Sequence, residues 1–159
     1  MEKRQKIEET FELIKRTQIK SESLYSGKVI NDEDLKHHSK YVHLEPGEVP
    51  LAMVDTRVAF WGRMTGLVIT DRNVYYRCMK MKMLFRGLTM FLSSRNVGKV
   101  ALDDLHEISI GWPVFALTTY CGHRFSINGQ LVGTLILGDG YTYDDKLVEN
   151  LETLFKALV

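Results

Sequence analysis

Cys121-Gly122-His123 places a thiol and an imidazole two residues apart, on one face of an expected strand. A thiolate nucleophile needs such an adjacent base. No acidic residue in the neighbouring sequence is placed to orient His123, and the surrounding residues are typical of a buried strand. We therefore expect no catalytic residues. We interpret Cys78 and Cys121, the only cysteines of the chain, as small buried apolar side chains.

Three histidines, His37, His38 and His43, raise the question of a metal site. Adjacent residues on a helix point about 100° apart, and no Cys, Asp or Glu completes a ligand set at a familiar spacing. The chain also lacks a phosphate-binding loop and a dinucleotide-binding glycine motif. We expect neither a metal nor a cofactor, and we predict that the protein is not an enzyme.

Positive charge is concentrated in the middle of the sequence, although the net charge of the 159-residue chain is only +1. No acid occurs from Arg72 to Leu102, and this run holds seven bases. In its centre, the segment RCMKMKMLFRGLTMFLSSR (residues 77–95) alternates bases with Met and Phe. Clustered charge of this kind attracts an anionic partner.

Two amphipathic helices should flank this region. The first covers residues 2–20 and places Ile7, Phe11 and Ile14 on one face. A separate short helix is expected over residues 32–41. Near the end of the chain, leucines recur at intervals of four and three, and Thr142 with Asp145 resembles a capping box. No apolar run reaches the roughly 18 residues of a membrane span, and we expect a cytoplasmic protein.

Short alternating segments predict seven or eight strands between the helices. Asn128-Gly129 is typical of a two-residue hairpin, because both residues tolerate positive φ. The apolar parity reverses after Cys78, which predicts a bulge or a strand end at Cys78–Met79. Antiparallel strands followed by one helix favour a mainly β (α+β) barrel plugged by that helix. The expected strands cover residues 51–58, 66–71, 73–79, 98–104, 105–111, 114–122, 123–128 and 130–138.

Three motifs in this region resemble those of bacterial pleckstrin-homology-like (PH-like) and related GRAM domains. The matching residues are Gly47 and Glu48 in the lead-in, Gly66, Thr70, Asp71 and Tyr76 in a hairpin, and Val100, Leu102, Asp104, Leu105 and Ile108 in a later strand pair. Arg72 lies one place before the usual Arg, Asn73 occupies its position, and Ala101 replaces the usual Pro. The resemblance implies a PH-like domain over residues 44–159, after an N-terminal helical extension over residues 1–43.

In a meander of this kind, the loop after the first strand and the loop after the third lie at one end. We expect that end to lie opposite the terminal helix, where the family binds inositol phosphates. The sequence therefore predicts a non-enzymatic module that binds an anionic lipid head group or a membrane surface. The predicted ligand-binding bases are Arg57, Arg63, Lys80, Lys82, Arg86 and Arg95, and the predicted membrane or partner contacts are Phe60, Trp61, Phe85 and Phe91.

Other interpretations of the same region stay open. The Met- and Phe-rich residues 79–92 fit equally a protein-interaction or self-association surface, or ordinary packing with a solvated basic face. Nucleic-acid binding is disfavoured, because stacking along a basic groove needs aromatic side chains on one face. Tyr75 and Tyr76 point to opposite faces of their strand.

Overall fold

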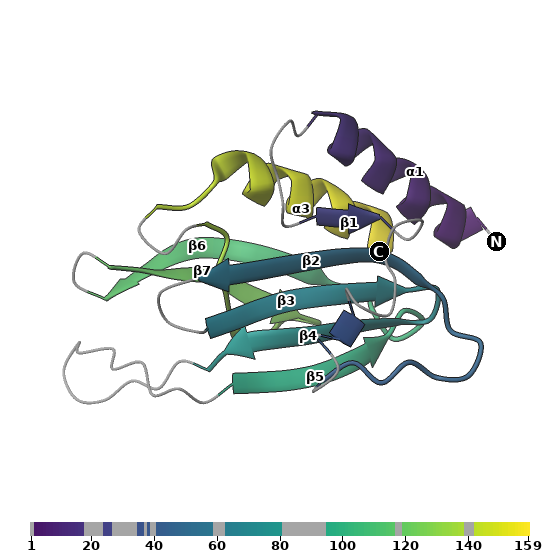
Figure 1. Cartoon of the computed structure of the whole chain (residues 1–159), viewed down its shortest axis with the longest axis horizontal. Helices are drawn as coiled ribbons and strands as arrows, with labels where there is room; N and C mark the ends of the chain where they lie inside the picture. Colours follow the sequence, from purple (N-terminus) through teal and green to yellow (C-terminus); the bar gives the residue numbers. More distant parts are fainter. Residues whose placement is uncertain are drawn as a thin grey trace.

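The computed structural model describes residues 2–17, 24–26, 35–36, 38, 41–58, 63–80, 95–116, 119–138 and 142–159. Its elements, shown in Figure 1, are α1 (Glu2–Thr17), β1 (Leu24–Ser26), β2 (Pro50–Val58), β3 (Arg63–Thr70), β4 (Asn73–Met79), β5 (Arg95–Ala101), β6 (Ile108–Ala116), β7 (Thr119–Ile127), β8 (Gln130–Leu135) and α3 (Asp145–Leu158). No helix among the described residues is long and apolar enough to cross a membrane.

The strands form one antiparallel sheet built from two meanders. The first meander runs from β2 to β5, with the short β1 added to β2, and the second runs from β6 to β8. They meet where β8 reaches the end of β4, at the pair Met79 and Thr134. No ladder among the described strands joins β6 to β1 or β2, so the sheet is a curled half-barrel. The predicted mainly β fold with a terminal helix is confirmed at this level.

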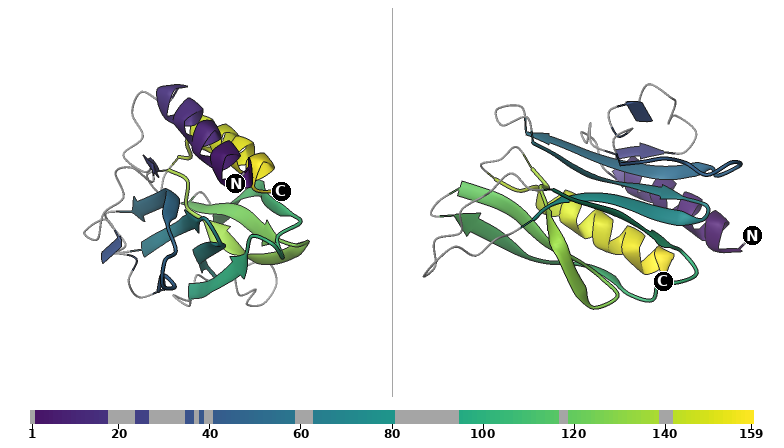
Figure 2. Two further views of the ribbon diagram at one scale, coloured as in Figure 1. Left: turned by 90° about the vertical axis from the view of Figure 1, so that its right-hand side faces the viewer. Right: turned by 90° about the horizontal axis from the view of Figure 1, so that it is seen from below.

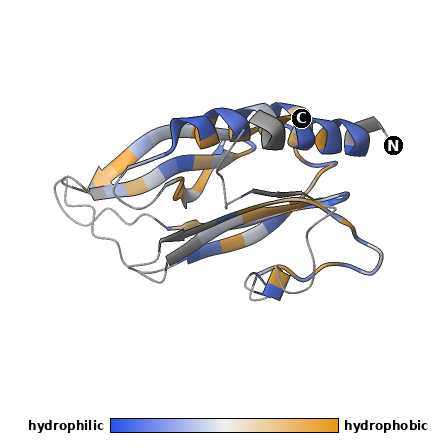
Figure 3. Ribbon diagram, turned by 45° about the horizontal axis from the view of Figure 1, so that its top comes forward, coloured by the Kyte–Doolittle hydropathy of each residue, from blue (hydrophilic) through white to orange (hydrophobic). Residues whose placement is uncertain are grey.

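Both helices lie along the open side of the curled sheet (Figure 2). In α3, Leu147, Leu151, Leu154 and Phe155 are buried against the inner face of the strands, as the leucine spacing predicted. α1 packs against α3 and β2, and its Ile7 and Phe11 join the same apolar core. Figure 3 shows hydrophilic residues on the outward surfaces of the two helices, as expected for amphipathic segments.

The outer face of the first meander carries a second, smaller apolar cluster. Successive strand residues point to opposite faces, so Met53, Val68 and Tyr75 face outward while their neighbours enter the main core. Tyr41 and Val42 cover them, with Leu35 and Leu44 partly buried alongside. The sheet is therefore covered on one side by the helices and on the other by residues 35–44, as far as these are described.

One predicted strand is wrong. The expected strand 114–122 is divided, because β6 ends at Ala116 and β7 begins at Thr119. The sequence there has no Gly, Pro or Asn to mark a turn. Gly122, the expected end of this strand, lies inside β7 with φ +106. A Cβ at Gly122 would lie 2.7 Å from the carbonyl oxygen of Leu135, so the close approach of β8 explains this glycine.

Two other local predictions are refined by the structure. β4 stays in register with β5 from Asn73 to Met79 and ends there, so the parity change at Cys78–Met79 marks a strand end and not a bulge. The hairpin turn is confirmed, with φ +51 at Asn128 and φ +75 at Gly129.

The N-terminus of α3 also differs from the prediction. The expected capping box at Thr142 is wrong, because the N-cap of α3 is Asp144. The Asp144 side chain accepts hydrogen bonds from the backbone amides of Lys146 and Leu147.

Candidate functional site

Four of the six predicted ligand-binding bases flank connections at one end of the first meander (Figure 1). Arg57 and Arg63 lie next to the connection between β2 and β3, where Val58 pairs with Arg63. Lys80 follows the last residue of β4, and Arg95 opens β5, paired with Met79. Both Lys80 and Arg95 are exposed. We call this region, where residues 59–62 and 80–94 connect the strands, the loop end.

The remaining predicted residues lie outside the described part of the chain. These are Lys82, Arg86, Phe60, Trp61, Phe85 and Phe91. The expectation that the loop end lies opposite the terminal helix is corrected, because α3 runs beside the strands and begins toward the loop end (Figure 1). An amphipathic helix gains most burial by covering a long open side of a curled sheet, and this sheet leaves such a side open.

Sequence reasoning missed two exposed aromatic side chains on the edge strand β6. Trp112 is 84% exposed and Phe115 is 46% exposed. The register of β6 with β7 shifts on both sides of Pro113, which breaks the usual alternation of buried and exposed residues. Pro113 could have indicated this irregular edge strand, because proline inside a strand marks an edge or a bulge.

A compact aromatic cluster backs the loop end. Tyr120 packs with Met79 and Ile136, and its ring contacts those of Phe115, His123 and Tyr143. The Tyr120 hydroxyl accepts a hydrogen bond from the backbone amide of Leu137 at 3.2 Å. The same hydroxyl is hydrogen-bonded to Nδ1 of His123, 2.6 Å away.

Cys121 and His123, the thiol and imidazole pair of the sequence, have structural surroundings and not those of an active site. Both residues are buried, and Nδ1 of His123 is engaged by Tyr120. Burial lowers the pKa of His123 below its ordinary value, although the nearby Asp145 carboxylate opposes this. A neutral, enclosed imidazole of this kind packs the end of the sheet.

Two of the motif residues, Glu48 and Thr70, belong to a buried hydrogen-bonded cluster, which we call the staple, and not to an open site. The buried Glu48 carboxylate accepts hydrogen bonds from the Thr70 hydroxyl, the Asn73 side-chain amide at 2.9 Å and the Tyr75 hydroxyl at 2.8 Å. It also accepts one from the backbone amide of Glu45. Burial alone would raise the pKa of Glu48, but these hydrogen bonds outweigh it and hold the pKa below its ordinary value. The lead-in and the hairpin are thus joined at the start of the sheet.

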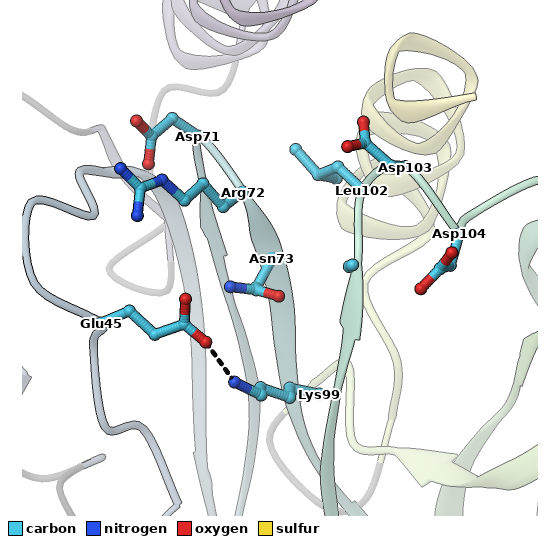
Figure 4. Close-up of a pocket in the computed structure, with 9 residues that line it drawn as sticks. Glu45, Asp71, Arg72, Asn73, Lys99, Leu102, Asp103 and Asp104 are labelled. Atoms are coloured by element: carbon cyan, nitrogen blue, oxygen red, sulfur yellow. Dashed lines mark hydrogen bonds and ion pairs between the residues drawn. The ribbon is translucent and has the colours of Figure 1, made fainter.

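An open pocket of about 520 Å³ lies at the other end of the meander, beside this staple (Figure 4). Lys99 donates to Glu45 at 2.6 Å, and Arg72 donates to the Pro46 carbonyl at 3.4 Å. Three more carboxylates line the pocket, at Asp71, Asp103 and Asp104. Acids outnumber bases here, so the pocket disfavours an anion, and the loop end is the stronger candidate for anion binding.

Metal ligation was the other chemistry considered from the sequence. His38 is buried and bonded to Tyr41, His43 is exposed, and His37 lies outside the described residues. Within the described part of the chain, no group of three or more His, Cys, Asp and Glu side chains is placed to hold a metal ion. Comparison with known proteins found no matching family model, no matching curated protein and no matching solved structure.

Proposed function

We propose that the protein is a PH-like, non-enzymatic binding module that engages an anionic lipid head group or membrane surface through its loop end, in the cytoplasm. The PH-like assignment is supported by a four-stranded meander, β2–β5, a three-stranded one, β6–β8, and the terminal helix α3. Two of the residues that suggested the family, Glu48 and Thr70, are hydrogen-bonded to each other at the start of the sheet.

The observation that carries the functional proposal is the convergence of bases at the loop end. Exposed Lys80 and Arg95 mark where residues 80–94 leave and rejoin the sheet, and Lys82 and Arg86 belong to the same acid-free run. Each base near an anionic membrane surface contributes about 1 kcal/mol. Several together are therefore needed for stable binding, and aromatic side chains add contact with the membrane interface.

Vesicle flotation tests this proposal. The wild-type protein should float with vesicles of phosphatidylcholine and phosphatidylserine at low salt, and not with phosphatidylcholine alone. The triple variant Lys80→Glu, Lys82→Glu, Arg86→Glu should not float. The matched control Arg4→Glu, Lys6→Glu, Lys156→Glu has the same net charge but changes exposed bases on the two helices, and it should still float. A wild-type protein that ignores anionic vesicles and inositol phosphates at low salt would refute the proposal.

A second candidate is a protein-interaction or self-association module. The observation that favours it is the exposure of Trp112 and Phe115 on β6, together with the Met- and Phe-rich residues 79–92. Large exposed aromatic side chains are typical of protein interfaces. Sedimentation velocity of the wild type and of Trp112→Ser at several concentrations would show whether the protein self-associates through this strand.

A further inference from the structure

The outer face of the first meander buries charge beneath a cover. Asp55 on β2 pairs with Gly66 on β3, and Gly66 pairs with Arg77 on β4, so the three form a row across the strands. Asp55 and Arg77 are each only 5% exposed. Burying charged groups costs free energy that their pairing often fails to recover. Covering this row therefore carries a free-energy cost that burial of the apolar core on the other face does not.

The cover consists of Leu35, His38 and Tyr41–Leu44, which we call the strap. Gly66 is required first by β2, because a Cβ there would lie 2.6 Å from the Val54 carbonyl oxygen. It also leaves room for the strap, since that Cβ would lie 3.2 Å from the Tyr41 hydroxyl and 3.3 Å from Cε1 of His38. Nδ1 of His38 is hydrogen-bonded to the Tyr41 hydroxyl, and Nε2 of His38 lies 3.7 Å from the Asp55 carboxylate. The Tyr41 ring also lies beneath the Arg77 guanidinium, 5.8 Å from its central carbon. The strap thus closes over the charged row with two polar side chains.

Few backbone contacts hold the strap on the sheet. Within the described residues, the strap forms no ladder with a strand. The Tyr75 hydroxyl lies 3.1 Å from the His43 carbonyl oxygen, but its one proton is shared with the closer Glu48 carboxylate. The amides of Tyr41 and Val42 donate back to the His38 carbonyl within the strap itself. Opening the strap would therefore leave the β2–β4 ladders intact.

Two polar atoms at this interface are also unsatisfied in the closed state. Among the described residues, Nε2 of His38 and Nε of Arg77 have no hydrogen-bond partner. Water reaching these atoms on opening would recover part of their hydration. The α3 interface holds one such atom, Nδ2 of Asn150, and the other buried side chains of α3 are apolar, so detaching that helix gains less compensation for the apolar surface that it exposes.

We propose that the strap opens as a unit while the main core stays folded, and that it uncovers Met53, Val68 and Tyr75 together with Asp55 and Arg77. Local openings of this kind occur where a segment has few ladder contacts and imperfectly satisfied polar groups. The proposal does not depend on the function proposed for the loop end. The outer face of the first meander is then covered only while the strap is closed.

Thiol labelling under native conditions tests the proposal. Met53→Cys places a thiol under the strap, and native Cys78 provides a control on the inner face; the two positions are 1% and 0% exposed. Labelling by N-ethylmaleimide is followed by peptide mass spectrometry, and each rate is divided by its rate in denaturant. Position 53 should label at least about tenfold faster than Cys78. Tyr41→Ala should accelerate labelling at position 53 further, and position 53 should remain the faster of the two.

Equal normalised rates at the two positions would overturn the proposal, because the strap would then open only with the whole domain. Hydrogen exchange of the wild type is a second measurement that needs no substitution. The amides of Tyr41 and Val42 should exchange faster than those of Leu67 and Val68 in β3. Exchange of all four at one rate set by global unfolding would also overturn it.

Discussion

The Glu48 carboxylate and the Tyr75 hydroxyl lie 2.8 Å apart, and their hydrogen bond joins the lead-in of the sheet to β4. Glu48→Gln replaces one acceptor oxygen with an amide that faces hydroxyl and amide donors. Leaving buried donors without an acceptor costs about 1–3 kcal/mol. Urea unfolding at pH 7 should show a loss of this size. The control Glu45→Gln removes a surface ion pair with Lys99 and should change stability by about 1 kcal/mol or less.

The same carboxylate predicts a pH dependence on the acid side. Its pKa in the folded protein lies below the ordinary 4.5, so the unfolded chain takes up the proton first as the pH falls. Glu48 therefore contributes stability above pH 4.5 that is lost as the pH falls through its folded pKa. Unfolding free energies measured from pH 6 to pH 3 should fall more steeply for the wild type than for Glu48→Gln. Parallel curves would contradict the prediction.

His123 should give a separate dependence at higher pH. Its folded pKa lies below the ordinary 6.5, so on acidification the unfolded chain is protonated before the folded one. Stability should decline as the pH falls from 6.5 toward the folded pKa and then level off. His123→Gln should remove this part of the slope between pH 7 and pH 5. His106→Gln, which changes an exposed histidine, should retain it; a His123→Gln slope identical to that of the wild type would exclude this role.

Truncation of Leu151 tests the contribution of α3 to the core. Leu151 is 1% exposed and belongs to the main apolar cluster. Leu151→Ala should lower the free energy of unfolding by about 2–5 kcal/mol, as large-to-small core substitutions do. Thermal or urea unfolding measures this, with the exposed neighbour Glu152→Ala as the control. If Leu151→Ala unfolds like the wild type, α3 does not hold the sheet together.

Ionic strength should separate the two candidate functions. Attraction between exposed bases and an anionic membrane is screened over roughly 8 Å at physiological salt, so vesicle binding should weaken steeply between 50 and 500 mM NaCl. Apolar docking through Trp112 and Phe115 should be nearly insensitive to salt over the same range. Because each base contributes about 1 kcal/mol, Lys80→Glu alone should have only a small effect on flotation. Abolition of binding by this single substitution would indicate a specific contact.

Elements with strong periodic patterns were predictable from the sequence. The leucine spacing of α3 reflects burial of one face, and Asn128-Gly129 marks a turn that needs two positive φ values. The division between β6 and β7 could not be located, because residues 116–119 include no Gly, Pro or Asn. Tertiary contacts across strands, such as those that enclose His123, leave no periodic pattern in the sequence.

The candidate site was predictable only in part. Lys80 and Arg95 could be predicted because the clustering of bases is apparent in the linear sequence. Trp112 was missed, because its exposure depends on the register shifts around Pro113. The row of Asp55, Gly66 and Arg77 was also missed, because it is assembled from three strands whose pairing register is a property of the folded sheet.

The contact between α1 and α3 has a consequence for synthesis on the ribosome. Ile7 and Phe11 are buried in a core that Leu154 and Phe155 complete, and every strand is translated between these two pairs. A nascent chain carries the apolar face of α1 through synthesis of the whole sheet before its α3 partner exists. At about 5–20 residues per second, the roughly 140 residues between the two pairs take about 7–29 seconds to translate, and over that time the apolar face of α1 lacks the α3 part of its cover.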